Sequence, residues 1–173
     1  MNRTFKIIVV VLMILMLFLL LSNRPKVKGG FVTNETVEGS ENPFFIYETV
    51  RYPSSVEILE KNQNRTGIFV GITGEPWNLN FGVLPRGIDE RKFINLANHK
   101  EEIYKVEVIA YGNISPMISF DKNNFILHPN EEKKVEVFLN TSLSTKTGNF
   151  TGEIDVVSKR LKYQFLTQVL GWF

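Results

Sequence analysis

The chain has 173 residues, 43% of them hydrophobic, with no cysteine and a formal net charge of +2. The lack of cysteine excludes disulfides, thiolate metal sites and cysteine nucleophiles. Removing the five basic residues that flank the apolar N-terminus from the 20 in the chain leaves 15 against 18 acidic residues, so the remainder is acidic and gives no support to a nucleic-acid partner. These five are Arg3, Lys6, Arg24, Lys26 and Lys28.

The N-terminus carries an apolar run from Ile7 to Leu21 without a polar residue. With its flanking residues the run is just long enough to cross a bilayer, and we expect a short cytoplasmic tail over 1–6 and a transmembrane anchor over 7–22. A cleaved signal peptide is the competing interpretation, although residues 20–23 offer no small-x-small cleavage site. Residues 23–43, which contain Pro25, Gly29 and Gly30, are predicted to form a stalk.

Beyond the apolar run the chain contains five N-x-S/T sequons, which begin at Asn34, Asn64, Asn113, Asn140 and Asn149. Basic residues lie on both sides of the apolar run, so charge alone does not orient the anchor. Sequons are glycosylated outside the cytoplasm, and five in one segment favour an extracytoplasmic C-terminal domain. We therefore predict a single-pass protein of the cell membrane, with these asparagines as possible N-glycosylation sites.

From Phe44 onward the sequence repeats short alternating segments separated by turn residues, the pattern of β-strands. The segments with a strand pattern are 44–50, 56–59, 68–73, 77–81, 91–96, 104–110, 117–120, 125–127, 134–139, 152–157 and 161–169. The pattern predicts an all-β fold over 44–173, an immunoglobulin-like antiparallel β-sandwich of seven to nine strands.

Three positions carry particular expectations. Pro53 interrupts an apolar segment, which predicts an edge strand or a strand that changes sheets. Lys159 and Arg160 are interpreted as a tight hairpin before the last strand. Ile154 and Val156 alternate with Glu153 and Asp155, so the two acidic side chains should point away from the core.

A family resemblance rests on short motifs within residues 77–158. The segments are Asn80-Phe81-Gly82-Val83, Arg91 to Asn98, Ile114 to Phe120, Phe125 to Pro129, Lys133 to Leu139 and Gly148 to Val157. In this order they resemble the immunoglobulin-like modules of the ASH and major-sperm-protein type, although asparagine at 130 replaces the usual glycine after proline. The anchor followed by a sandwich also looks like small archaeal surface proteins, including the sandwich subunits of the archaellum. The resemblance implies a fold more than a function.

No motif for catalysis or for a cofactor is present. The two histidines, His99 and His128, stand at predicted turns without a third ligand, so we expect no metal site. We therefore name no catalytic, cofactor-binding or metal-binding residue. An enzyme would need a site assembled from scattered side chains.

These observations favour a membrane-anchored binding or assembly module that acts by protein–protein recognition at the cell envelope. The expected partner is an envelope or surface-layer protein, and a homo-oligomer is compatible with the sequence. The alternative is a structural subunit of a surface filament such as a pilus or archaellum. An archaeal-type pilin is disfavoured because Met1 to Lys6 lacks the glycine of its processing site.

Overall fold

The computed structural model describes residues 5, 7–14, 30–60 and 78–163. Residue 5 and residues 7–14 are helical, and within the described part of the chain no helix is long and apolar enough to span a membrane. The predicted strand at 68–73, Trp77, the sequon at Asn64 and the second half of the predicted anchor lie outside the described residues, as do the C-terminal residues 164–173.

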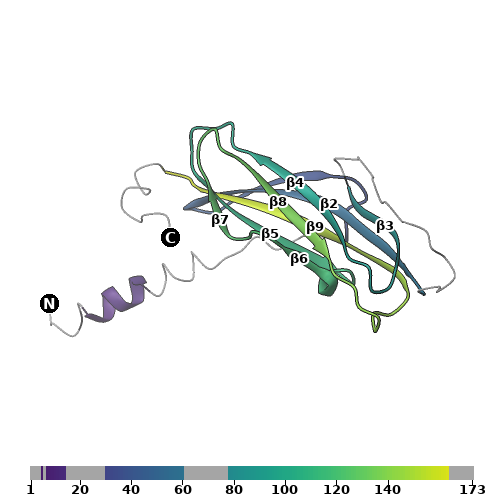
Figure 1. Ribbon diagram of the computed structural model, residues 1–173. Coiled ribbons are helices and arrows are strands. Elements are labelled where there is room, and N and C mark those ends of the chain that lie inside the picture. The colour runs from purple at the N-terminus through teal and green to yellow at the C-terminus, as the bar shows by residue number, and fades with distance from the viewer. Residues whose placement is uncertain (1–4, 6, 15–29, 61–77, 164–173) are drawn as a thin grey trace.

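The described chain forms nine strands in two sheets, in a sandwich-like arrangement compatible with an immunoglobulin-like fold (Figure 1). The strands are β1 (Thr36–Glu41), β2 (Phe45–Leu59), β3 (Leu79–Pro85), β4 (Glu90–Ala97), β5 (Tyr104–Gly112), β6 (Ile118–Phe120), β7 (Phe125–Leu127), β8 (Glu132–Leu139) and β9 (Gly148–Leu161). A short 3-10 helix, η1, covers Ser115–Met117. The all-β prediction is confirmed.

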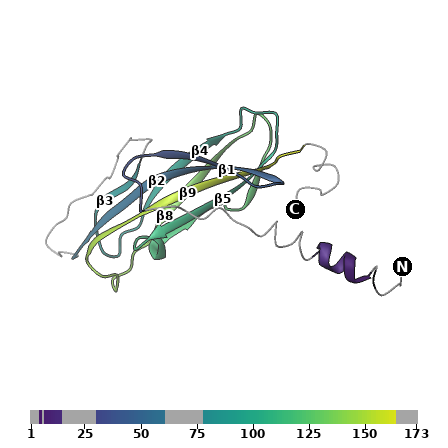
Figure 2. The same ribbon diagram turned by 180° about the vertical axis from the view of Figure 1, so that it is seen from behind.

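The main sheet has six strands in the order β1-β2-β9-β5-β7, with β3 also paired to β2. Because β9 pairs with β2 from Phe45 to Ile58, both β1 and β3 must lie along the other edge of β2. Figure 2 shows β1 beside β2 at the edge of this sheet. The minor sheet has the order β4-β8-β6. All pairings are antiparallel except that of β2 with β3, whose connection is long enough for a parallel crossover.

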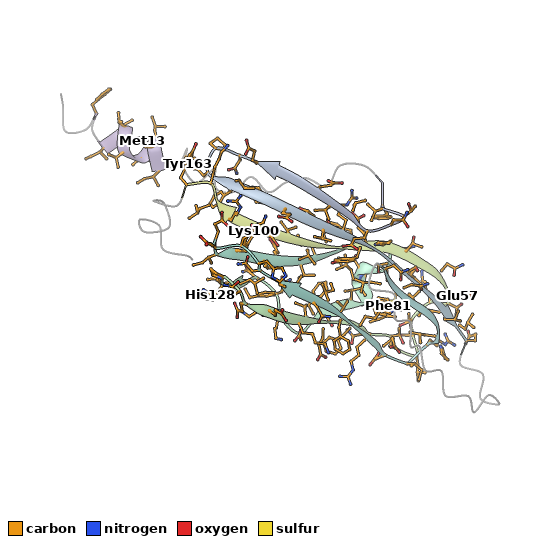
Figure 3. All side chains as sticks on the ribbon, turned by 90° about the horizontal axis from the view of Figure 1, so that it is seen from above. Met13, Glu57, Phe81, Lys100, His128 and Tyr163 are labelled. Atoms are coloured by element: carbon orange, nitrogen blue, oxygen red, sulfur yellow. The ribbon has the colours of Figure 1, made fainter. Side chains whose placement is uncertain are left out.

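The hydrophobic core lies between the two sheets. The alternating strands place one face of each sheet inward, and a fully buried aliphatic side chain contributes roughly 1.5–3 kcal/mol. The core residues of the main sheet are Val56, Ile58, Leu79, Phe81, Leu84, Tyr104, Val106, Val108, Leu127, Ile154 and Val156, and those of the minor sheet are Ile94, Val135, Val137 and Leu139. Figure 3 shows Phe81 between the sheets.

Pro53 is not at a sheet edge, which corrects the prediction for this region. β2 runs straight through it, between β9 on one side and β1 and β3 on the other. The pairing with β1 ends at Arg51 and that with β3 begins at Ser54, so Pro53 falls between the two partners. The missing backbone N–H of proline is tolerated at such an interruption.

The hairpin predicted at Lys159-Arg160 is wrong, because β9 continues to Leu161. Lys159 pairs with Tyr47 on one side and with Lys105 on the other, so both neighbouring strands hold it extended. Neither Lys159 nor Arg160 favours the positive φ angles that a two-residue hairpin turn requires. The ammonium of Lys159 lies 3.6 Å from the ring centroid of Phe45.

The sheet also begins earlier than the predicted boundary at residue 44. β1 occupies Thr36–Glu41, inside the segment interpreted as a stalk. Its six residues are all exposed, and the weak hydrophobicity of this strand explains why periodicity did not reveal it.

Candidate functional site: a buried ionic cluster on the outer face

The most unusual feature of the main sheet is a group of three charged side chains buried on its outer face, the face turned away from the minor sheet. Glu153 and Asp155 on β9 have 0% exposure, and Arg51 on β2 has 3%. The sequence pattern correctly placed the two carboxylates opposite Ile154 and Val156, but it gave no sign that they are buried. We call Arg51, Glu153 and Asp155 the ionic cluster.

The strand register brings the three side chains together. Arg51 stands directly opposite Asp155 in the β2–β9 ladder, and Glu153 lies two positions along β9 on the same face. The Nη2 atom of Arg51 donates to the carboxylate of Glu153 and lies 2.9 Å from each of its oxygens, Oε1 and Oε2. Its Nη1 donates to Oε1 of Glu38 on β1 at 2.8 Å. The guanidinium therefore joins three strands.

The ionic cluster also holds the chain that precedes β1. Nη2 of Arg51 donates to the carbonyl oxygen of Gly30 at 3.1 Å. The backbone N–H of Val32 donates to Oε2 of Glu153 at 3.1 Å. Residues 30–33 are thus fastened to the outer face of the sheet by side chains of the cluster.

Asp155 is the least satisfied member of the cluster. Neither of its carboxylate oxygens has a hydrogen-bond partner among the described residues, and Nε of Arg51 lies 4.0 Å from Oδ1. Burial, reinforced by the charge of Glu153, raises the pKa of Asp155 to about 7, although Arg51 opposes the shift. For Arg51, burial lowers the pKa, but the hydrogen bonds with Glu153 and Glu38 outweigh burial and leave the pKa raised.

The histidines are not brought into any such group. His99 and His128 are exposed at the end of the sandwich opposite Glu57, where Figure 3 shows His128 and Lys100. The backbone N–H of His128 donates to Oε2 of Glu131 at 2.7 Å. Among the described residues, no group of three or more histidine, aspartate or glutamate side chains could hold a metal ion.

Asn98 lies at the same end of the sandwich, directly before His99. Asn98 is buried, and its Nδ2 donates to the carbonyl oxygen of Glu102 at 2.7 Å. The backbone carbonyl oxygen of Asn98 accepts from the N–H of Asn130, whose φ of 57° is a positive angle that asparagine tolerates in a turn. Asn98 thus has a structural role.

Four of the five sequon asparagines are described, and all four are exposed. Three of them, Asn113, Asn140 and Asn149, lie near one end of the sandwich, because Asn113 bonds to Thr151 and Asn140 bonds to Met117. Oδ1 of Asn113 accepts from the N–H of Thr151 at 2.6 Å, so its amide oxygen and not its amide nitrogen makes this bond.

Comparison with protein-family models, with curated proteins and with solved structures found no match to this chain. The class of protein that the structure itself defines is an all-β protein with two sheets packed as a sandwich and a buried ionic cluster on the outer face of the larger sheet.

Proposed function

We propose that this protein is a membrane-anchored, extracytoplasmic module that recognises another envelope protein through the free edge of β1. The anchor, the orientation and the immunoglobulin-like module of the ASH and major-sperm-protein type are parts of this proposal that come from the sequence. The recognition surface is supported by one observation, the position and exposure of β1.

β1 is the terminal strand of the main sheet, and no other described strand pairs with its far edge. An unpaired edge presents backbone N–H and C=O groups that an extended segment of a partner can pair with. Val37 has 62% exposure, and a Cβ added at Gly39 would meet nothing within 4 Å, so the faces of the strand are open at these two positions.

The charges of β1 do not block this edge. Glu38 is bonded to Arg51, and Glu41 pairs with Nζ of Lys162 at 3.0 Å. The edge of β4 is a poorer template, because Arg91 and Lys92 place two positive charges on that strand. We therefore favour β1 as the strand that a partner extends.

Site-specific crosslinking tests the proposal. A photoreactive amino acid replaces Val37 in the full chain in its native membranes, and a matched control replaces Leu143, which is equally exposed but lies in the loop between β8 and β9. We expect an adduct with a second envelope protein from position 37 and none from position 143. Equal adducts from both positions, or none from position 37, would contradict recognition through β1.

The structural-subunit alternative uses the same edge, with a strand from a second copy in place of a different protein. The mass of the crosslinked adduct separates the two cases. An adduct between two copies of this chain, together with concentration-dependent assembly of the full chain in detergent, would favour the filament subunit.

A further inference from the structure

The ionic cluster attaches the segment 30–33 to the main sheet by two hydrogen bonds from its side chains. The carbonyl of Gly30 is held by Arg51, and the N–H of Val32 is held by Glu153. Both bonds depend on the pairing between Arg51 and Glu153, which positions the two side chains. Any change in the charge of the cluster therefore acts on this segment.

The charges of the cluster do not balance when both carboxylates are ionised. The one guanidinium is already bonded to Glu153, Glu38 and Gly30. An ionised Asp155 would be a buried anion without a hydrogen bond from the described residues, which is costly. The Nε atom of Arg51 is its nearest cationic donor, and a shift of about 1 Å would bring it within hydrogen-bonding distance.

The positions directly opposite Asp155 supply no positive charge besides Arg51, because its other partner is Ile109 of β5. The charged and titratable groups nearest to it on this face are Arg51 of β2, Glu38 of β1, Glu153 of β9, and Glu107 and Tyr111 of β5. Lys105 of β5 is on the same face but stands opposite Lys159, four positions along β9 from Asp155. Residues 30–33 contain no titratable side chain. Farther along β9, the Lys159 ammonium lies over the ring of Phe45. A proton on Asp155 is the remaining way to balance the cluster.

We propose that the ionic cluster is a proton-dependent switch: it fastens residues 30–33 to the main sheet while Asp155 is protonated and releases them when Asp155 loses its proton. Ionised Asp155 draws the guanidinium of Arg51 toward itself and repels Glu153, and both bonds to the segment weaken. The raised pKa of Asp155 puts this change near neutral pH. If the proposed anchor precedes the segment, release lengthens the tether by up to ~3.5 Å per residue.

Hydrogen exchange at the amide of Val32, corrected for the intrinsic effect of pH on exchange, tests the switch in the full chain in detergent. We expect the protection of this amide to fall about tenfold or more between about pH 5.5 and about pH 8.5. In Asp155→Asn, which has no proton to lose at this position, the fall should be absent. In Glu153→Gln, which keeps an acceptor for Val32 but removes the charge beside Asp155, the fall should begin at lower pH.

Two controls separate the switch from general effects of pH on the protein. Glu57→Gln removes an exposed carboxylate from the same face of β2 and should behave as the wild type. The amide of Val156, in the centre of β9, reports opening of the whole sheet. Protection of Val32 that is independent of pH in the wild type, an equal fall in Asp155→Asn, or a parallel loss at Val156 would each overturn the proposed switch. This result is separate from the crosslinking at β1.

Discussion

Arg51 compensates most of the buried negative charge on the outer face of the main sheet. Arg51→Leu would leave Glu153 and Asp155 buried without a cation, and removal of one partner from a buried ion pair costs roughly 3–5 kcal/mol. We expect a loss of this size in the free energy of unfolding, measured by urea denaturation. Arg91→Leu is the control, because Arg91 is exposed and forms a surface ion pair, with its Nη1 atom 3.7 Å from Oε2 of Glu136. Removing this ion pair should lower the free energy of unfolding by less than about 1 kcal/mol. Equal effects of the two substitutions would contradict the role given to Arg51.

Gly152 stands where β5 and β9 approach most closely. A Cβ at this position would lie 1.9 Å from the carbonyl oxygen of Tyr111, and backbone cannot move aside as a flexible side chain can. Gly152→Ala should therefore lower the stability by about 1–3 kcal/mol or more, as overpacking does. Gly39→Ala, in the exposed strand β1, has open space and should be nearly neutral. Thermal unfolding of both variants checks the prediction, which fails if Gly152→Ala melts with the wild type.

The edge of β5 is completed by a side chain. β7 pairs only with Tyr104 to Val106, and just beyond it Asn123 continues the ladder. Its Oδ1 accepts from the N–H of Val108 and its Nδ2 donates to the carbonyl of Val108, both at 2.8 Å. The amide thus takes the place of one more strand residue.

Asn123→Ala should cost about 1–3 kcal/mol, because it leaves both backbone groups of Val108 without their partner. Asn95→Ala, at an exposed position of β4, is the matched control. Denaturation gives the stability, and hydrogen exchange at the Val108 amide gives the local effect. An unchanged exchange rate at Val108 would show that Asn123 does not protect this edge.

The elements that could be predicted are those whose alternation is strong. β4, β5, β8 and most of β9 follow from their period of two. β1 was missed because its side chains are exposed on both faces. Lys159-Arg160 was misread because local polarity suggested a turn, whereas pairing on both sides keeps the strand extended.

The ionic cluster could be predicted only in part. Two carboxylates at positions 153 and 155 of one strand must share a face, which the sequence shows. Their burial depends on pairing with Arg51, about a hundred residues earlier, and no local pattern specifies that register. A cation within an apolar strand segment opposite such a pair is the signal that could have suggested it.

At the scale of the whole molecule, Asp155 gives the stability a defined dependence on pH. Its pKa is about 7 in the folded chain and about 3.9 when unfolded, so the folded state binds more protons between these values. Stability should therefore be highest at low pH as far as this group is concerned, and should fall as the pH rises from about 4 through about 7. Urea denaturation at about pH 5 and about pH 8 should give the lower free energy of unfolding at the higher pH.

Asp155→Asn should remove this difference in stability between the two pH values. At about pH 8 the variant should unfold at a higher urea concentration than the wild type. The carboxyl groups of Asp121 and Glu131 act in the opposite direction. For Asp121, burial raises the pKa, but hydrogen bonds from the backbone and from Lys122 outweigh burial and lower it. For Glu131, the hydrogen bond with Lys133 lowers the pKa. The stability that these two groups contribute is therefore lost only in more acidic solution. A wild type that is equally stable at both pH values would contradict the state assigned to Asp155.

The long pairing of β2 with β9 has a consequence for how the chain folds as it is made. β2 finds its partner only when β9, the last described strand, is available, and partners such as Tyr52 and Ile154 are about a hundred residues apart. The chain loses the conformational entropy of closing so long a loop before the stabilising contacts between β2 and β9 form, and this makes folding slow. While the chain emerges from the N-terminus, β1 and β2 remain without the strand that occupies the centre of the sheet. Nascent chains that stop before residue 148 should therefore stay unfolded, and folding should begin only after β9 has emerged.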